Sequence, residues 1–198
     1  MTISDMSATP IGPSSTRWEI SGASEGFGRT FGDLMASGKD IDGEARLADA
    51  MLPRGGRVLD VGAGMGRVSA ALTARGHDVV AIEPDAALVA QARSTYPGIQ
   101  ITERDVLDLV VCVGNVMVFL AEGTERAALA AMRDVLAENG RILVAFHFKN
   151  APFNARPYPA EEFARDVEAA GLKVDLRART YELHPADDSY GVWILSRT

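Results

Sequence analysis

The chain has 198 residues, of which 47% are hydrophobic, and this is enough to build one core without covalent cross-links. Its 27 Asp and Glu residues outnumber its 20 Lys and Arg residues, and the formal net charge of -7 argues against a broad surface for nucleic-acid phosphates. Cys112 is the single cysteine, which excludes a disulfide scaffold, and no apolar run reaches the roughly 18 to 20 residues that a membrane span needs. We therefore expect a cytoplasmic protein without a membrane or nucleic-acid partner.

The N-terminal part of the chain precedes any strand pattern. Residues 1–16 are polar, rich in Ser, Thr and Pro, and are predicted to be a disordered leader. Phe27 and Phe31 begin a group of apolar residues at helical spacing, and Leu47 begins a second group. Residues 17–53 are therefore predicted to form two amphipathic helices that cap the rest of the domain.

Short apolar runs separated by helical patterns follow, over residues 57–147. The predicted strands are residues 58–61, 79–82, 109–113 and 142–146. Helices are predicted between them, one of which Thr124 caps and Asn139 and Gly140 end. Strands that alternate with helices indicate a parallel sheet covered on both faces.

The C-terminal part, residues 148–198, begins with a lid segment. Pro159 opens a further helix that Gly171 ends, and residues 172–183 and 190–196 are strand-like and joined by a polar turn. This pair is predicted to form an antiparallel hairpin at the edge of the sheet. Because no repeat or low-complexity linker divides the chain, residues 17–198 are predicted to form a single domain.

The most informative segment is RVLDVGAGMGRVS, residues 57–69, in which a strand leads through three glycines into a helix. Glycines at the carboxyl end of a strand let the backbone approach a ligand closely, although a glycine-rich turn can also simply close a tight connection. Two acidic residues favour the ligand. Asp60 lies inside an apolar strand, where a carboxylate is costly without a polar partner, and Glu83 ends the next strand 21 residues after Gly62, as a ribose-binding acid does.

These residues resemble the class I S-adenosylmethionine-dependent methyltransferases. The resemblance implies a Rossmann-like α/β fold with a seven-stranded, mostly parallel sheet in the order 3-2-1-4-5-7-6, an antiparallel last strand and helices on both faces. It also implies S-adenosylmethionine as cofactor and S-adenosylhomocysteine as product. The cofactor-binding residues that it implies are Asp60, Gly62, Ala63, Gly64, Gly66, Glu83, Pro84, Gly114 and Asn115.

Asp105 matches the position of the family's adenine-binding acid at the end of strand three, which residues 99–102 resemble. The connection from Asp105 to Leu109 is too short for that strand order, because it reaches about 14 Å at most and needs about 22 Å. Either a loop is missing there or strand three is lost, and the strand-like residues favour a missing loop.

A nicotinamide-dependent dehydrogenase is the main competing interpretation, because it also combines a glycine turn with a later acid. Its usual pattern is GxGxxG, whereas the third residue after Gly64 is Arg67. A dinucleotide site would also leave Asp60 unexplained.

The acceptor is predicted to be a small molecule, because the lid segment FHFKNAPFNARPYP is aromatic and carries few charges. His147, Asn154 and Tyr158 are candidates for the acceptor pocket, with His147 as the best general base and Tyr158 as a second catalytic candidate; alternatively, the segment is only a packed lid. No metal motif is present, and methyl transfer needs none. A non-catalytic cofactor-binding or regulatory protein and an RNA or protein methyltransferase remain as alternatives.

Overall fold

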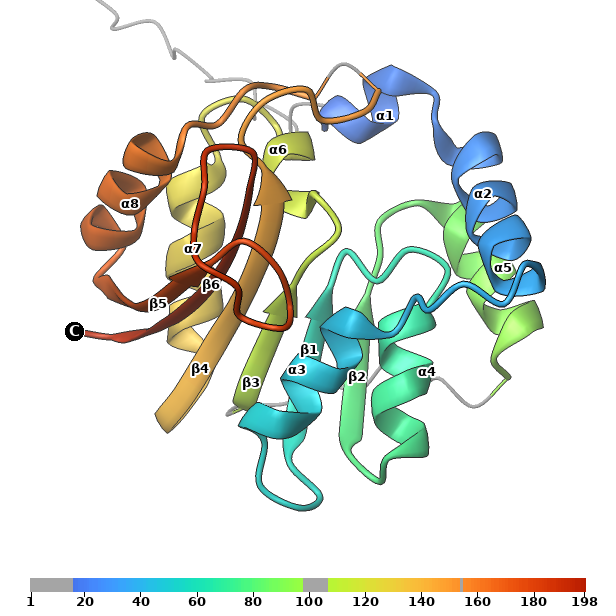
Figure 1. Ribbon diagram of the computed structural model, residues 1–198, viewed down its shortest axis with the longest axis horizontal. Helices are drawn as coiled ribbons and strands as arrows, with labels where there is room; N and C mark the ends of the chain where they lie inside the picture. The colour runs from blue at the N-terminus through green and yellow to red at the C-terminus, as the bar shows by residue number, and fades with distance from the viewer. Residues whose placement is uncertain (1–15, 98–106, 154) are drawn as a thin grey trace, which may run out of the picture.

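The computed structural model describes residues 16–97, 107–153 and 155–198 (Figure 1). The strands are β1 (Arg57–Val61), β2 (Asp78–Ile82), β3 (Leu107–Cys112), β4 (Leu136–His147), β5 (Leu172–Ala178) and β6 (Tyr190–Arg197). The helices are α1 (Arg17–Ser21), α2 (Ser24–Ala36), α3 (Gly43–Met51), α4 (Arg67–Ala74), α5 (Ala86–Thr95), α6 (Val116–Phe119), α7 (Glu125–Asp134) and α8 (Ala160–Ala169).

The strands form one sheet in the order β2-β1-β3-β4-β6-β5. Neighbours from β2 to β4 pair in parallel, whereas β6 is antiparallel to both β4 and β5. The predicted antiparallel hairpin at the sheet edge is confirmed. The described sheet has six strands, which corrects the expected seven: the expected extra strand, at residues 99–102, lies outside the described residues, and so does Asp105.

Both faces of the central strands are buried, as the apolar runs predicted. Along β4, Ile142, Val144 and Phe146 belong to one core cluster, and Leu143 and Ala145 belong to the other. The first cluster includes side chains of α6, α7 and α8, and the second includes side chains of α3 and α4. Helices therefore cover the two faces, and this arrangement leaves the carboxyl edge of the parallel strands open for a site.

The helix predicted after Thr124 is shorter than expected, because α7 ends at Asp134. Leu136 instead pairs with Leu107 at the start of β4, and the ladder then continues with Arg141 opposite Leu109. Thr124 stands at the N-cap position but makes no side-chain cap bond. Pairing with a distant strand thus overrides the local helical pattern near Leu136.

Helices α1 and α2 lie before the sheet in sequence and over its carboxyl edge in space (Figure 1). The segment that follows β4 crosses above the strand ends beside α1. The predicted leader comprises residues 1–16, and all of it except residue 16 lies outside the described part of the chain. Within the described part, no helix combines the length and the apolar character that a membrane span requires.

Candidate functional site

The glycine loop connects β1 to α4 at the centre of the carboxyl edge. Gly62, Gly64 and Gly66 have φ angles of 69°, 57° and 84°, a region that favours glycine. The amides of Gly62 and Ala63 both donate to the carbonyl oxygen of Ile82, at 2.8 and 3.1 Å, which ties the loop to the end of β2. The loop is therefore fixed before any ligand binds.

Gly62 also has no room for a side chain. A Cβ at this position would lie 2.5 Å from Cγ2 of Val116, at the start of α6. The loop and α6 therefore approach each other closely only because residue 62 is glycine.

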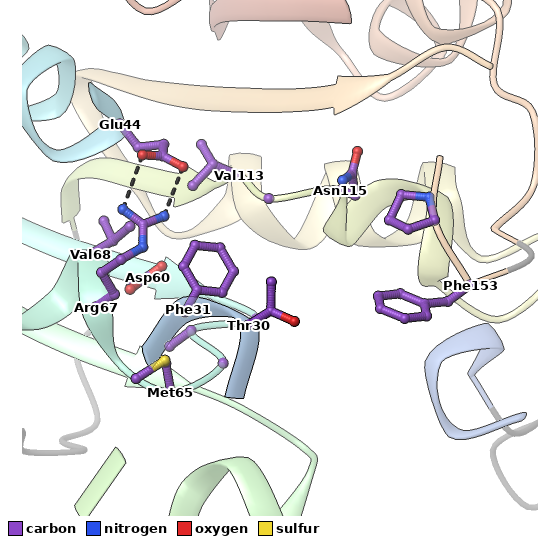
Figure 2. A pocket seen from close by; sticks show the side chains of 15 residues that line it. Thr30, Phe31, Glu44, Asp60, Met65, Arg67, Val68, Val113, Asn115 and Phe153 are labelled. Atoms are coloured by element: carbon purple, nitrogen blue, oxygen red, sulfur yellow. Dashed lines mark hydrogen bonds and ion pairs between the residues drawn. The ribbon is translucent and has the colours of Figure 1, made fainter. Parts of the chain in front are cut away.

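Two cavities meet at the loop. The first, of about 320 Å³, is shown in Figure 2, and the second has about 290 Å³. The first is lined by Thr30, Phe31, Glu44, Asp60, Gly62, Ala63, Gly64, Met65, Arg67, Val68, Val113, Gly114, Asn115, Pro152 and Phe153. The second is lined by Thr16, Trp18, Val61, Gly62, Gly64, Ile82, Glu83, Pro84, Leu88, Gly114, Val116, Phe119 and Leu120. Gly62, Gly64 and Gly114 line both, so one ligand can extend along the backbone from one cavity into the other.

Asp60 supplies a carboxylate to the first cavity from within β1. It is 2% exposed, and the Ser69 hydroxyl donates to its Oδ2 at 2.6 Å. Burial raises the pKa of Asp60 to about 6, and the Ser69 hydrogen bond and the charge of Arg67 limit the rise. Keeping the Asp60 carboxylate ionised therefore costs desolvation free energy, and a cationic group of a ligand would offset that cost.

Glu83 supplies the carboxylate of the second cavity. Its Oε2 accepts from the Gly64 amide and its Oε1 from the Asp85 amide, both at 2.8 Å. Burial raises the pKa of Glu83, and these two backbone hydrogen bonds oppose the rise. The cavity around Glu83 is apolar, because Ile82 and Pro84 line it and the Ile82 side chain is 48% exposed.

An ion pair that sequence reasoning did not include borders the first cavity. Arg67 donates to both carboxylate oxygens of Glu44 at 2.8 and 3.1 Å, and also to the carbonyl oxygen of Ile41. The guanidinium carbon lies 5.2 Å from the centre of the Phe31 ring. Figure 2 shows this pair beside Phe31. No fixed spacing links a residue of α3 to one of α4, so only the folded chain reveals the pair.

Aromatic side chains cover both cavities. Trp18 lines the second cavity and donates from Nε1 to Oδ2 of Asp85 at 2.7 Å. Its ring stands edge-on to Phe119 and Phe153, with centroids 5.4 and 6.1 Å away. Because Phe153 lines the first cavity, the contact between Trp18 and Phe153 joins the covers of the two cavities.

A buried carboxylate anchors both covering segments. Glu125, at the start of α7, is 5% exposed and pairs with Nη1 of Arg17 at 3.3 Å and with Nε of Arg156 at 2.8 Å. Arg17 belongs to α1, and Arg156 belongs to the segment after β4. Two guanidinium groups thus compensate the buried charge, which fixes both segments to one point.

Of the two predicted catalytic residues, Tyr158 is not brought to the site. It is completely buried, stacks on Phe146 at 5.4 Å and donates from its hydroxyl to Oδ2 of Asp166 at 2.6 Å. Burial and the Asp166 hydrogen bond raise the pKa of Tyr158. It lines neither cavity, because its hydroxyl is satisfied inside the core. Asn154, the third candidate from the lid segment, lies outside the described residues.

His147 does not line the first cavity. Its amide donates to Oδ1 of Asn115 at 2.8 Å, and its Nδ1 lies 3.0 Å from the same oxygen. Burial lowers the pKa of His147. Asn115 itself lines the cavity.

The remaining predictions concern metal and thiol chemistry. Within residues 16–97, 107–153 and 155–198, no cluster of three or more His, Cys, Asp or Glu side chains suits a metal ion. Cys112 is 1% exposed in β3, and burial, reinforced by the charge of Asp60, raises its pKa to about 12. Its thiol is a buried apolar group, as predicted from its apolar neighbours.

Comparisons with known proteins agree with this geometry. Residues 58–140 match the family model of a methyltransferase domain. A TehB-like SAM-dependent methyltransferase from Corynebacterium glutamicum ATCC 13032 Kitasato is 33% identical over 89% of this chain and 99% of its own, with a TM-score of 0.78. No curated protein matches the sequence significantly.

Two more distant structures share the fold. The glycopeptide N-methyltransferase MtfA, solved in complex with (S)-adenosyl-L-methionine, is 18% identical over 80% of this chain and 95% of its own, with a TM-score of 0.63. The mitomycin 7-O-methyltransferase MmcR is 16% identical over 93% of this chain and 61% of its own, with a TM-score of 0.65.

The fit of Gly62 against Val116 predicts a large cost for Gly62→Ala. The substitution adds the strain of a left-handed alanine, about 1–2 kcal/mol, to a steric overlap worth about 1–3 kcal/mol, so we expect a loss of about 2–5 kcal/mol in urea unfolding. Gly55→Ala is the matched control, because Gly55 has φ 66° and nothing within 4 Å of a Cβ. Equal losses in the two variants would contradict a special role for the contact with Val116.

The core position of Tyr158 predicts that Tyr158→Phe lowers stability. Loss of the hydroxyl leaves Asp166 without one of its donors, which costs about 1–3 kcal/mol, whereas the ring packing is kept. Urea unfolding measures the change. An unchanged unfolding midpoint would show that the hydroxyl does not serve the core and would return Tyr158 to the catalytic candidates.

Proposed function

The chain belongs to the class I S-adenosylmethionine-dependent methyltransferases, and we propose that it transfers the methyl group by in-line displacement to a small-molecule acceptor. The enzyme class and the cofactor are those of the family. The observation that carries the proposal is the backbone wall of Gly62, Gly64 and Gly114, which lines both the first cavity, with Asp60, and the apolar second cavity, with Glu83.

The shape and chemistry of the two cavities fit the two halves of the cofactor. Glu83 would accept from the ribose hydroxyls, and Ile82 and Pro84 would contact the adenine ring in the second cavity. Asp60 would receive the amino group of the methionine half in the first cavity. Support for this orientation comes from the raised pKa of Asp60, since an ammonium group would offset the cost of its ionised form.

The bound cofactor would supply a sulfonium methyl group that is electrophilic enough for direct attack by the acceptor. The chain's own contribution is therefore to hold, align and shield the reactants. The glycine wall lets both halves lie against the backbone, and the cover of Trp18 and Phe153 limits the access of water. Because His147 lines neither cavity, we assign no proton transfer to it.

A small acceptor is supported by the lining of the first cavity. Beyond the glycines it presents Phe31, Val113, Pro152 and Phe153, and the Arg67 guanidinium there is already paired with Glu44. This surface suits a compact, partly apolar molecule better than a nucleic-acid backbone, which needs free cationic groups. The glycopeptide N-methyltransferase MtfA and the mitomycin 7-O-methyltransferase MmcR are named for a glycopeptide and for mitomycin, which agrees with a non-polymeric acceptor.

Isothermal titration calorimetry tests the cofactor assignment first. We expect S-adenosylmethionine and S-adenosylhomocysteine to bind and NAD to give no heat. A screen of small acceptors for release of S-adenosylhomocysteine then tests the activity. Binding of NAD alone would overturn the proposal, and turnover only with RNA or protein acceptors would overturn its small-molecule part.

The pKa of Asp60 predicts a pH-dependent effect of Asp60→Asn on the free protein. Because the folded pKa is raised to about 6, the stability contributed by this group is full below about pH 4 and is lost as the pH rises through about 6. The neutral amide avoids that loss. At about pH 8 we expect the free energy of unfolding of Asp60→Asn, measured with urea, to exceed that of the wild type by about 1–3 kcal/mol. At about pH 4 we expect the two to be equal.

The same variant should bind S-adenosylhomocysteine at least about tenfold more weakly at about pH 8, because the carboxylate that would meet the amino group is gone. Ser69→Ala is the control, since it removes the hydrogen bond to Asp60 but keeps the charge. A stability difference that does not vary with pH, or an unchanged affinity, would contradict the role of Asp60.

A further inference from the structure

The orientation of the Asn115 amide group is determined by its neighbours. The amide of His147 can only donate, and it lies 2.8 Å from one atom of the Asn115 side chain, which must therefore be Oδ1. The contact joins Asn115, the residue just before α6, to the last residue of β4. Asn115 has φ 74°, an uncommon conformation that asparagine tolerates better than most residues.

The same oxygen also determines the protonation of His147. Its Nδ1 lies 3.0 Å from Oδ1 of Asn115, and because a carbonyl oxygen only accepts, Nδ1 must carry the hydrogen. The imidazole ring is held edge-on against Tyr190, with centroids 4.7 Å apart, and the Tyr190 hydroxyl is paired with that of Tyr181 at 2.8 Å. His147 therefore occupies the amide oxygen of Asn115 with two donors.

The amide nitrogen of Asn115 is left for the cavity. Asn115 is half-buried and lines the first cavity, and none of the hydrogen bonds found among the described residues uses its Nδ2. Figure 2 shows the amide oxygen pointing away from Thr30 and Phe31, with the nitrogen on their side. The side chain therefore offers hydrogen-bond donors, and no acceptor, to a bound molecule.

The carboxylates of the same cavity are already engaged. Glu44 accepts from Arg67, and Asp60 accepts from Ser69 deep in the β1 strand. Pro152 and Phe153, from the covering segment, line the same cavity. The Asn115 amide therefore brings hydrogen-bond donors to this cavity that no contact among the described residues uses.

We propose that Asn115, oriented by His147, selects methyl acceptors that present an oxygen as hydrogen-bond acceptor, such as a hydroxyl, carbonyl or carboxylate, over those that present an ammonium. The proposal rests on the proposed function, since it concerns the acceptor of the same site. His147 is a positioning residue: it acts through Asn115 and touches neither cavity. This role replaces the general-base role predicted from the sequence.

Nitrogen-15 NMR of the imidazole rings tests the positioning step. The chain has only three histidines, so the signal of His147 is assigned by its loss in His147→Phe. We expect the Nδ1–H tautomer in the wild type and its loss in Asn115→Gly, which removes the amide but accepts the positive φ. Tyr190→Phe keeps the ring contact and should leave the tautomer unchanged. A wild-type ring protonated at Nε2 alone would overturn the assignment.

Ligand binding to the complex with S-adenosylhomocysteine tests the selection. Benzoate and benzylamine are the probes, because they carry an oxygen acceptor and an ammonium on similar rings, and saturation-transfer NMR measures both. We expect the wild type to prefer benzoate by about tenfold, the size of one charge-assisted hydrogen bond. Asn115→Gly should reduce the preference to about twofold or less, and His147→Phe should reduce it by a smaller factor.

Asn115→Asp is the decisive variant, because its Oδ1 still accepts from His147 whereas the NH₂ group becomes an oxygen. We expect it to prefer benzylamine, with both probes measured on the variant saturated with S-adenosylhomocysteine. A wild-type preference for benzylamine, or no binding of either probe, would overturn the inference. If the wild type does not bind S-adenosylhomocysteine, the proposed function is overturned instead, so the two failures are distinguishable.

Discussion

The site depends on one steric constraint, the absence of a side chain where β1 turns into the glycine loop. Gly62 lies so close to Val116 that even a Cβ would overlap it, and its φ of 69° is one that other residues rarely adopt. Because the loop is also bonded to the end of β2 through Ile82, the ends of the first strands and α6 form one rigid edge. The two cavities share that edge, so their relative position is set by backbone and not by mobile side chains.

This rigid edge carries two carboxylates, Asp60 and Glu83, whose charge is disfavoured by burial. Burial raises the pKa of both Asp60 and Glu83, which means that the free protein holds two carboxylates under conditions that disfavour their charge. Glu83 is held by backbone amides and Asp60 by Ser69, so neither can turn toward solvent without losing a hydrogen bond. Such pre-oriented groups bind a ligand without a cost of rearrangement, and this is a common trade of stability for function.

The sequence predicted most of the sheet and the place of the glycine loop because those features are local. Apolar runs define strands, and glycines with Asp60 and Glu83 at fixed spacing define the loop. Features that depend on distant contacts were missed or misplaced. Leu136 leaves its helical pattern to pair with Leu107, and Tyr158 turns its hydroxyl into the core toward Asp166. The bond between His147 and Asn115 spans 32 residues, and the direction of a side chain at a strand end cannot be read from spacing.

The buried position of Cys112 matters for a protein that handles an alkylating molecule. The only cysteine of the chain lies two residues before Gly114, which lines both cavities. Thiolates are the side chains that alkylating agents attack most readily, and only the deprotonated form reacts. Because burial raises the pKa of this thiol to about 12, the thiol stays protonated at about pH 7. The core of the sheet thus keeps the chain's one thiol chemically inert, and it should resist thiol reagents and oxidants for the same reason.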